Sequence, residues 1–245
     1  GFEVVLVEKN PQLGGLMREL TDTIEGDDIQ AHLSDVIALV EQNANIQVLT
    51  ESLIVDFKGF KGNFTTEIMV GPSMYQREID HGIVILATGA QEYKPTEFLY
   101  GEDDRVITHL ELDRRLYESG ADDLERVVMV QCVGSRNEEN PNCSRICCQS
   151  AIKNAIQIKK LNPETDVFIL YRDIRTYGRM EEYYREARRL GVIFFRFDKD
   201  HPPQVENTEN GLMVRFKDHV LQREIQAPAD IVALSTGMRA EETDE

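Results

Sequence analysis

The amino-acid sequence predicts an α/β protein made of two related units, each built around a parallel β-sheet. Apolar, β-branched runs typical of buried parallel strands alternate with segments whose apolar residues recur at helical spacing. This pattern runs through the chain twice, and the segments IVILATGA (83–90) and IVALSTGM (231–238) match each other at the ends of the two rounds. Alternating strands and helices favour a parallel sheet, and the internal echo indicates two units of related design.

The first round begins with FEVVLVE (2–8), a run expected to form a central parallel strand. A turn with paired glycines follows, and the apolar residues between Asp28 and Asn43 then recur with the period of a helix. Four short stretches with strand composition come next: IQVL, LIVDF, NFTTEIMV and YQREI. The apolar segment GIVILATGA (82–90) is expected to be the last strand of this round.

The second round begins with ERVVMVQC (125–132), which is expected to form a buried strand. CSRICCQSAIKNAIQIKKL (143–161) is expected to form a helix, and DVFILYRD (166–173) the next strand. The sequence continues with the helix MEEYYREARRL, the strand VIFFRF, the hairpin-like pair LMVRF and VLQREI, and the strand DIVALSTGM. The boundary between the units is expected in the polar stretch between Tyr93 and Glu125.

The charge of the chain excludes several classes of partner. Its 245 residues carry a formal net charge of −17, with a sequence pI near 4.7. Such a charge argues against binding to nucleic acid or to an anionic membrane surface. The sequence has no signal peptide and no apolar run long enough for a direct membrane span, so a cytoplasmic protein is expected.

All four cysteines lie within seventeen residues: Cys132, Cys143, Cys147 and Cys148. Their spacing differs from the C-x2-C pairs of structural zinc sites and suits four thiolates around a metal cluster, with Cys143 and Cys147 one helical turn apart. A tetrahedral zinc site and buried, inert thiols remain open as alternatives. A disulfide framework is disfavoured, because adjacent cysteines bridge only with strain and nothing marks the chain as secreted.

Three features of the first round point to a nucleotide ligand when they are taken together. Glu8 ends the first strand, where an acid can accept hydrogen bonds from a ribose diol, although an ordinary strand-end carboxylate is the simpler alternative. Gly14 and Gly15 allow the backbone to approach a ligand closely. The small residues Ala87-Thr88-Gly89 allow the chain to pass beside a flavin without an intruding side chain.

These features together resemble the flavin-binding half of the two-dinucleotide-domain flavoproteins, the thioredoxin reductase-like group. Members of that group begin with a strand and a G-x-G-x-x-G loop. Neither this initial strand nor its glycine loop precedes FEVVLVE, which corresponds to the second strand of the group, so the chain is expected to be an interior piece of a larger flavoprotein. In the second round, Gln131-Cys132-Val133-Gly134-Ser135-Arg136 stands where a second glycine loop would bind a nicotinamide nucleotide.

The motifs QCVGSR, CSRICC, AIKNA and LYRDIRTYG resemble the A-type subunit of heterodisulfide reductase, an iron–sulfur flavoprotein, and its relatives, over nearly the whole chain. The resemblance implies two Rossmann-like dinucleotide-binding-type domains with parallel sheets. Residues 1–105 would form the FAD-binding-type domain, 106–228 the second domain with the cysteines, and 229–245 a return strand to the FAD domain. The resemblance also implies two cofactors: FAD, near Glu8, Gly14, Gly15, Leu53, Ala87, Thr88 and Gly89, and a 4Fe-4S cluster ligated by Cys132, Cys143, Cys147 and Cys148.

The function implied by the resemblance is that of an oxidoreductase subunit that passes electrons between FAD and the 4Fe-4S cluster. It would work with other redox subunits in an anaerobic heterodisulfide reductase-like or quinone-interacting complex, and no residue of this chain is expected to act as catalytic acid, base or nucleophile. The chain lacks the further cysteines and the inserted ferredoxin module of many relatives, which leaves bifurcation and the disulfide substrate open. The alternatives are an NAD(P)H-dependent flavin disulfide reductase and a non-catalytic, zinc-stabilised docking subunit.

Two further groups of residues are assigned structural roles. Tyr171, Arg172 and Arg175 follow a second-round strand, where the broader group binds a nicotinamide phosphate. Without a glycine loop they are expected to be structural or to face a partner. His109 is expected near the start of a helix.

Overall fold

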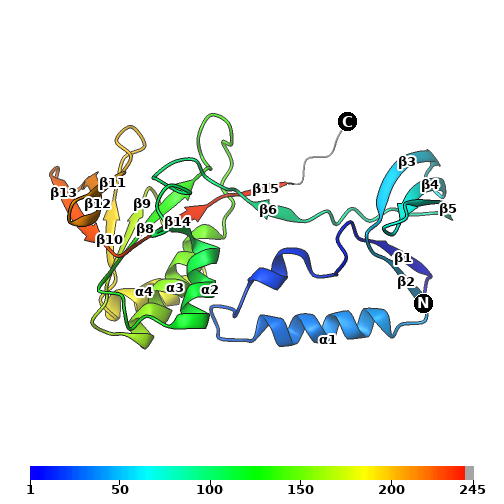
Figure 1. Ribbon diagram of the computed structural model, residues 1–245, viewed down its shortest axis with the longest axis horizontal. Helices are drawn as coiled ribbons and strands as arrows, with labels where there is room; N and C mark the ends of the chain where they lie inside the picture. The colour runs from blue at the N-terminus through cyan, green and yellow to red at the C-terminus, as the bar shows by residue number, and fades with distance from the viewer. Residues whose placement is uncertain (241–245) are drawn as a thin grey trace. The chain divides into compact units, whose positions relative to one another are not determined.

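The computed structural model describes residues 1–240 and divides into two compact units (Figure 1). The first unit contains residues 1–20 and 28–89, and the second contains residues 21–27 and 90–240. Each unit is described by itself below. Within residues 1–240, none of the helices combines the length and the apolar character that a membrane crossing requires.

The first unit contains a small parallel β-α-β element and an antiparallel sheet. Strand β1 (Val4–Val7) pairs in parallel with β2 (Ile46–Leu49), and helix α1 (Ile29–Glu41) connects them after the short 3₁₀ helix η1 (Gly15–Glu19). Asp28 caps α1, because its carboxylate accepts a hydrogen bond of 2.9 Å from the backbone N–H of Ala31.

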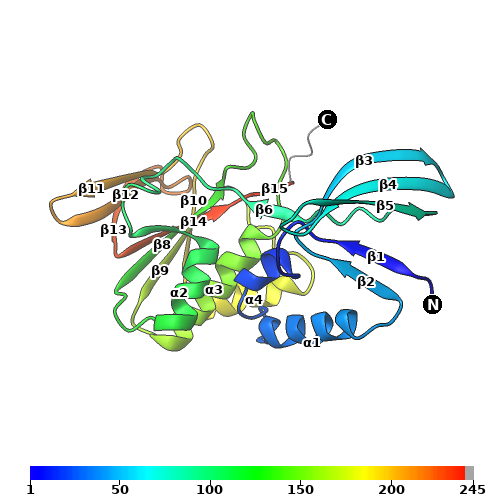
Figure 2. The same ribbon diagram turned by 45° about the vertical axis from the view of Figure 1, so that its right-hand side comes forward.

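Three antiparallel strands complete the first unit: β3 (Leu53–Phe60), β4 (Asn63–Val70) and β5 (Tyr75–His81). Figure 2 shows these strands side by side. The buried core of this unit is small and contains Leu49, Ile68 and Val70.

The predicted strand GIVILATGA does not form. Residues 83–89 have no strand assignment, and the next strand, β6 (Ala90–Glu92), begins only at the end of the segment. Ile85 and Leu86 are 85% and 84% exposed. A strand needs a hydrogen-bonded neighbour, and within the described residues β1 pairs only with β2, so the apolar pattern of 83–89 finds no sheet to join.

The second unit is built on a five-stranded parallel sheet with the order β10-β9-β8-β14-β7. Its strands are β7 (Val106–Thr108), β8 (Arg126–Val133), β9 (Asp166–Tyr171), β10 (Ile193–Arg196) and β14 (Ile231–Thr236). Three helices accompany the sheet: α2 (His109–Ser119), α3 (Cys147–Leu161) and α4 (Met180–Arg189). An antiparallel sheet contains β11 (Gln204–Thr208), β12 (Gly211–Lys217) and β13 (Glu224–Ala229), and β15 (Met238–Ala240) pairs with β6.

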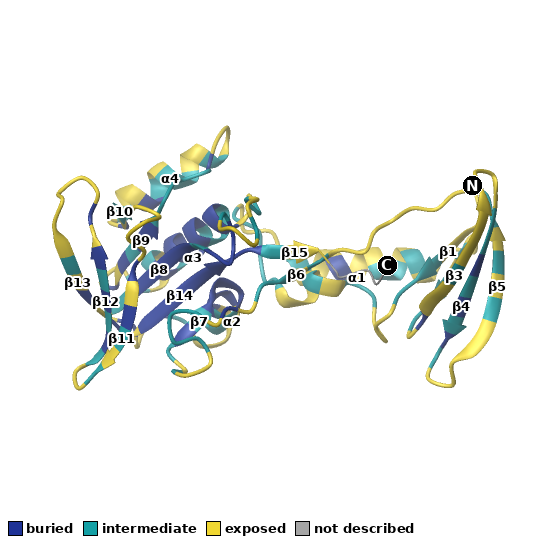
Figure 3. Cartoon of the chain, turned by 90° about the horizontal axis from the view of Figure 1, so that it is seen from above, coloured by how far each residue is buried: buried dark blue, intermediate teal, exposed yellow. Residues whose placement is uncertain are grey.

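Both faces of the parallel sheet are buried, and alternate residues of each strand serve the two faces. Met129 and Ala233 pack in a cluster with residues of the helices, such as Ile152. Their neighbours Val130 and Leu234 pack in a second cluster with residues of β11–β13. The continuous burial of β8 and β14 (Figure 3) explains why their sequences are almost uninterrupted apolar runs.

Helix α2 and strand β7 lie in the polar stretch between Tyr93 and Glu125, where the sequence predicts the boundary between the two units. The Thr108 hydroxyl accepts from the backbone N–H of Glu111 (3.3 Å), and the Glu111 carboxylate accepts from the backbone N–H of Thr108 (2.7 Å). This capping box fixes the start of α2. His109 is therefore the first residue of a helix, as expected.

Strand β14 differs from the prediction that residues 229–245 form a return strand to the FAD domain. It lies between β8 and β7 in the parallel sheet of the second unit, with Ala233 in register with both Met129 and Ile107. Because all six residues of β14 are buried, the strand requires a sheet that is covered on both faces, and the second unit provides one.

The central position of β14 makes a prediction about stability. Leu234→Ala removes a side chain with 0% exposure and should lower the free energy of unfolding by about 2–5 kcal/mol, because a cavity remains in the core. Leu221→Ala removes the same atoms from a side chain that is 61% exposed and should change stability by less than about 0.5 kcal/mol. Urea unfolding followed by circular dichroism measures both values. Equal losses for the two variants would contradict this assignment of the core.

Candidate metal centre

The four cysteines come from three consecutive parts of the second unit. Cys132 lies near the end of β8, Cys143 lies in the loop that follows, and Cys147 and Cys148 open helix α3. The carboxyl end of β8 and the N-terminus of α3 are joined by the loop 134–146. This edge of a parallel sheet is where α/β proteins generally bind ligands.

Cys132 occupies a β-bulge. Ser235 of β14 is in register with Gln131 and the next residue, Thr236, is in register with Val133, so Cys132 is the extra residue of β8. Its φ of 66° lies in the left-handed region, which is unfavourable for a residue with a side chain. A bulge re-aims a side chain, and here it takes the Cys132 thiol out of the regular alternation of the sheet.

Cys147 and Cys148 are the first two residues of α3, and no side chain caps this helix end. The backbone N–H groups of a first helical turn have no partners within the helix, and the helix dipole favours negative charge there. Both thiols are buried. A helix N-terminus is therefore a favourable place for thiolate charge.

The expectation that Cys143 and Cys147 share one face of a helix is wrong. Helix α3 begins at Cys147, and Arg145, between the two cysteines, has a φ of 65° that a right-handed helix cannot include. The backbone N–H of Arg145 lies 3.4 Å from the Cys143 Sγ, so the turn before the helix is arranged around this sulfur. Cys143 is a loop residue.

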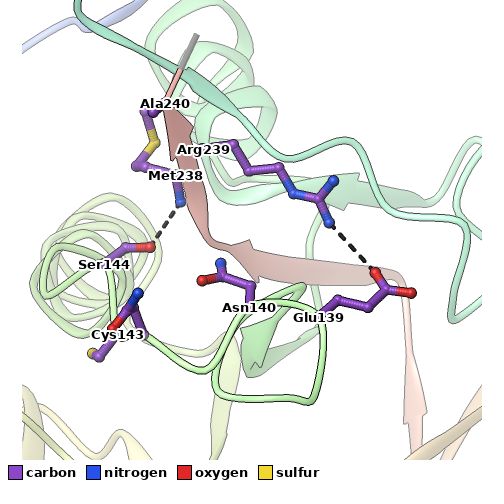
Figure 4. Close-up of a pocket in the computed structure, with 8 residues that line it drawn as sticks. Glu139, Asn140, Cys143, Ser144, Met238, Arg239 and Ala240 are labelled. Atoms are coloured by element: carbon purple, nitrogen blue, oxygen red, sulfur yellow. Dashed lines mark hydrogen bonds and ion pairs between the residues drawn. The ribbon is translucent and has the colours of Figure 1, made fainter. Parts of the chain in front are cut away.

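A cavity of about 440 Å³ opens beside Cys143 (Figure 4). It lies between the loop 139–144 and strand β15. The Ser144 hydroxyl accepts a hydrogen bond of 2.8 Å from the backbone N–H of Met238, and the Arg239 guanidinium lies 3.8 Å from the Glu139 carboxylate. These two contacts join the cysteine loop to β15.

Burial controls the acidity of the free thiols. Burial, together with the smaller effect of the three other cysteines, raises the pKa of Cys147 to about 12. Burial also raises the pKa of Cys148 and of Cys132, and for Cys132 the Arg136 guanidinium partly offsets the effect. The cysteines therefore lie within electrostatic range of one another, and without a bound cation these three thiols are protonated near neutral pH.

Three residues beside the thiols were not singled out in the sequence. The Arg136 guanidinium lies 3.9 Å from the Cys132 Sγ and 2.6 Å from the Asp173 carboxylate. The Cys147 thiol donates to the backbone carbonyl of Thr236 (3.1 Å), and the Cys148 thiol lies 3.7 Å from the carbonyl of Asp173. Arg136 stands near Cys132 in the motif QCVGSR, whereas the sequence gives no sign that Asp173 or Thr236 lies beside a cysteine. The segment after β9 supplies Asp173 and the end of β14 supplies Thr236, both from across the sheet.

The spacing of the thiols bears on which inorganic group they could hold. Within residues 1–240, no three His, Cys, Asp or Glu side chains lie close enough together to hold one metal ion. Four sulfur atoms at about 2.3 Å from a single zinc ion would be only about 3.8 Å apart. In a four-iron cluster each thiolate binds a different iron, so the sulfur atoms stay farther apart.

The residues expected to contact FAD all lie in the first unit: Glu8, Gly14, Gly15, Leu53, Ala87, Thr88 and Gly89. Glu8 directly follows β1, and its backbone carbonyl accepts a hydrogen bond of 3.0 Å from Ser52, the residue before Leu53. The end of β1 and the start of β3 are therefore adjacent. One Glu8 carboxylate oxygen accepts from the backbone N–H of Asn10 (2.8 Å).

The paired glycines form the turn before η1. Gly14 has a φ of 116°, and a side chain there would press against Leu33 of α1. Gly15 has a φ of 48°, with open space where a Cβ would lie. Gly14 therefore lies close to α1, whereas the space beside Gly15 is open. An open space beside a glycine suits a ligand that lies against the backbone.

Comparison with family models finds no match. Among curated proteins, the chain is 30% identical to the A-type iron-sulfur subunit of the CoB–CoM heterodisulfide reductase of Methanocaldococcus jannaschii, with 97% of this chain and 50% of the relative covered. It is 39% identical to the A-type subunit of the H(2):CoB-CoM heterodisulfide,ferredoxin reductase of Methanothermobacter marburgensis, with 66% of this chain and 27% of the relative covered. The chain spans about half the length, or less, of the curated relatives it matches.

Solved structures show the same fold at low sequence identity. The thioredoxin reductase of T. acidophilum superimposes with a TM-score of 0.59 at 14% identity, covering 97% of this chain and 70% of that one. The bacillithiol disulfide reductase of Bacillus cereus superimposes with a TM-score of 0.56 at 13% identity, covering 96% and 70%. The predicted fold class is therefore confirmed. Over nearly its whole length the chain is similar to the A-type subunits of heterodisulfide reductases, and its fold is thioredoxin reductase-like.

Proposed function

We propose that this chain is part of an oxidoreductase subunit that passes electrons between FAD and a 4Fe-4S cluster held by Cys132, Cys143, Cys147 and Cys148. The observation that carries the proposal is the gathering of all four cysteines of the chain at one edge of the second unit's sheet. A bulge, a left-handed turn and an uncapped helix start bring them there. Each of these features is a local cost to the fold, which favours a functional reason for the arrangement.

The relatives support the choice of cluster and flavin. The Methanocaldococcus jannaschii relative is named as an iron-sulfur subunit of its reductase, and the structural neighbours include flavin-dependent reductases. A 4Fe-4S cluster would supply one-electron transfer, while FAD would supply exchange between one-electron and two-electron chemistry. Glu8 would accept hydrogen bonds from the ribose of FAD, and the backbone at Gly14, Gly15 and 87–89 would lie against it, with Leu53 near the adenine.

The residues around the thiols would hold and tune the cluster. The N-terminus of α3, where the helix dipole is positive, and the Arg136 guanidinium supply positive potential beside Cys147, Cys148 and Cys132. Burial of Cys147 and Cys148 would keep water away from two of the ligands. Hydrogen bonds and limited solvent access are the means by which a protein sets a cluster's reduction potential.

The partners of the chain would be the other redox subunits of a heterodisulfide reductase-like or quinone-interacting complex. The Methanothermobacter marburgensis and Methanococcus maripaludis relatives are named as subunits of such reductases. A cytoplasmic location is expected for this assembly. The net charge of −17 continues to argue against nucleic acid as a partner.

The geometry of the loop after β8 disfavours the NAD(P)H-dependent alternative. In dinucleotide-binding domains a glycine in this loop lets the pyrophosphate approach the backbone. Here the ring of Tyr93 packs against Gly134, where a Cβ would overlap it. The place that a glycine loop leaves free for phosphate is thus occupied by a side chain of the protein.

Metal analysis tests the cluster. Protein prepared under strictly anaerobic conditions should contain about four iron atoms and four acid-labile sulfides per chain. Cys143→Ser should lose most of both, while Ser150→Ala, a matched change on α3, should keep them. A tightly bound zinc ion with no iron would overturn this proposal in favour of the zinc-stabilised docking subunit.

Reduction by nicotinamides tests the loss of the second dinucleotide site. NADH and NADPH should neither bind measurably to the second unit nor reduce the flavin when no partner subunit is present, because Tyr93 and the cysteines occupy the place of the pyrophosphate. Anaerobic stopped-flow absorbance measures the reduction, and calorimetry measures the binding. Rapid bleaching of the flavin by NADH alone would favour the disulfide reductase alternative.

Alkylation of the iron-free protein tests the environment of the thiols. Burial raises the pKa of Cys147 to about 12, so its thiolate population lies far below that of an unperturbed thiol with a pKa of about 8.5. Because the pKa is raised, the thiolate appears only as the pH climbs toward that value. At pH 8, iodoacetamide should modify Cys147 more than about a hundredfold more slowly than a short unfolded peptide. Mass spectrometry of time points measures the rate, and a rate within tenfold of the peptide's would contradict the burial of this thiol.

A further inference from the structure

The backbone around Cys132 has a conformation that its own residues disfavour. Cys132 and Arg136 have φ values of 66° and 57°, in the left-handed region, and Gly134 between them also has a φ of 66°. Within this segment the backbone N–H of Ser135 lies 3.4 Å from the carbonyl of Cys132, which is a long hydrogen bond. A strained backbone of this kind persists only where the surrounding structure fixes it.

The ring of Tyr93 lies directly against the middle of this segment. Gly134 is buried, and a Cβ placed on it would lie 1.9 Å from Cδ1 and 2.2 Å from Cε1 of Tyr93. Carbon atoms that are not bonded to each other stay about 3.5–4.0 Å apart. The ring therefore occupies the volume of the side chain that Gly134 lacks, and it rests on the bare backbone.

Contacts outside this segment hold Tyr93 in place. Its backbone N–H donates to the carbonyl of Gly237 (2.9 Å), and its hydroxyl donates to the Glu97 carboxylate (3.2 Å). The Arg239 guanidinium lies 4.2 Å from the centre of the ring, in a cation–π contact. The ring is therefore a fixed surface against which Gly134 can pack.

Gly237 connects the ring to strand β8. Its carbonyl accepts from Tyr93, and its N–H donates to the carbonyl of Val133 (2.9 Å), the residue directly after Cys132. Val133 is thus held by a hydrogen bond and Gly134 by the packing of the ring. The two residues that follow Cys132 are therefore fixed, and their backbone determines where the bulge directs its thiol.

Other contacts hold later parts of the same connection. The carbonyl of Arg136 accepts from the Arg172 guanidinium (3.0 Å), and the Arg136 guanidinium pairs with Asp173 (2.6 Å). The Asn140 side chain donates to the carbonyl of Gly134 (3.1 Å), but Asn140 itself belongs to the loop 134–146. The support that Gly134 receives from Tyr93 comes from outside this loop.

We propose that Tyr93 is a positioning residue for the cluster: its ring holds Gly134 and thereby keeps the Cys132 thiol where it binds iron. This inference rests on the proposed function, in which Cys132 is a cluster ligand. Tyr93 acts through the backbone and is neither a ligand nor an electron carrier. A phenylalanine ring has the same flat shape and supports Gly134 equally well, whereas alanine leaves a space into which the strained segment relaxes.

The rate of iron release tests this role. Anaerobically prepared protein that contains the cluster is mixed with the iron chelator bathophenanthroline, and the absorbance of the iron complex is followed. Tyr93→Ala should release iron about 10–100-fold faster than the unmodified protein, because residues that orient metal ligands affect metal affinity by this factor. Tyr93→Phe should release iron at the unmodified rate. Tyr117→Ala, which removes a 73% exposed ring from α2, is the matched control and should also keep that rate.

The midpoint potential of the cluster is the second readout, measured by redox titration with electron paramagnetic resonance. It should shift in Tyr93→Ala and stay unchanged in Tyr93→Phe, because hydrogen bonds to sulfur and solvent exposure set this potential. Circular dichroism establishes that each variant is folded, and Tyr93→Leu replaces Tyr93→Ala, with the same expectations, where the alanine variant does not fold.

The outcomes separate this inference from the proposed function. A lower melting temperature for Tyr93→Ala with unchanged iron release and potential would show that the ring only stabilises the fold, and it would overturn the inference while the cluster remained. Zinc without iron in the unmodified protein would overturn the proposed function and this inference together.

Discussion

The burial of both faces of the second unit's parallel sheet is the constraint on which the site depends. Alternate residues of β8 and β14 pack against the helices and against β11–β13. A shift of either strand by one residue would therefore move each set of apolar side chains to the opposite face of the sheet. This locked register fixes where each strand ends. The bulge at Cys132, the start of α3 and the cavity beside Cys143 lie at or beside the edge that these strand ends define.

The same constraint sets the electrostatics of that edge. Thiols placed against a packed core lose hydration, and this loss raises their pKa. They become thiolate ligands when a bound cation stabilises the negative charge in place of water. Arg136 places a positive charge at this edge, because its guanidinium contacts both Cys132 and Asp173.

Much of this fold follows from local patterns, and the exceptions have physical causes. The strands NFTTEIMV and ERVVMVQC and the helix before Gly191 are found where their periodicity predicts them. The start of helix α2 at His109 agrees with the sequence, and Thr108 and Glu111 show the spacing of the capping box that fixes it. The bulge at Cys132 was not predictable, because it depends on the register of β14, about one hundred residues later in the chain. The prediction of a strand at 83–89 was wrong, because an apolar pattern indicates a preference for burial but does not show that another strand is available for pairing.

The four cysteines are not equivalent, and this has a consequence for how an inorganic group could be installed. Cys132, Cys147 and Cys148 belong to a packed strand and helix, whereas Cys143 lies on a loop and borders the open cavity of Figure 4. Because Cys143 borders this cavity, metal and sulfide would reach the proposed cluster site past its thiol. In the proposed function, the three thiols on regular elements would be in place before the group is loaded, and the loop thiol of Cys143 would complete the set.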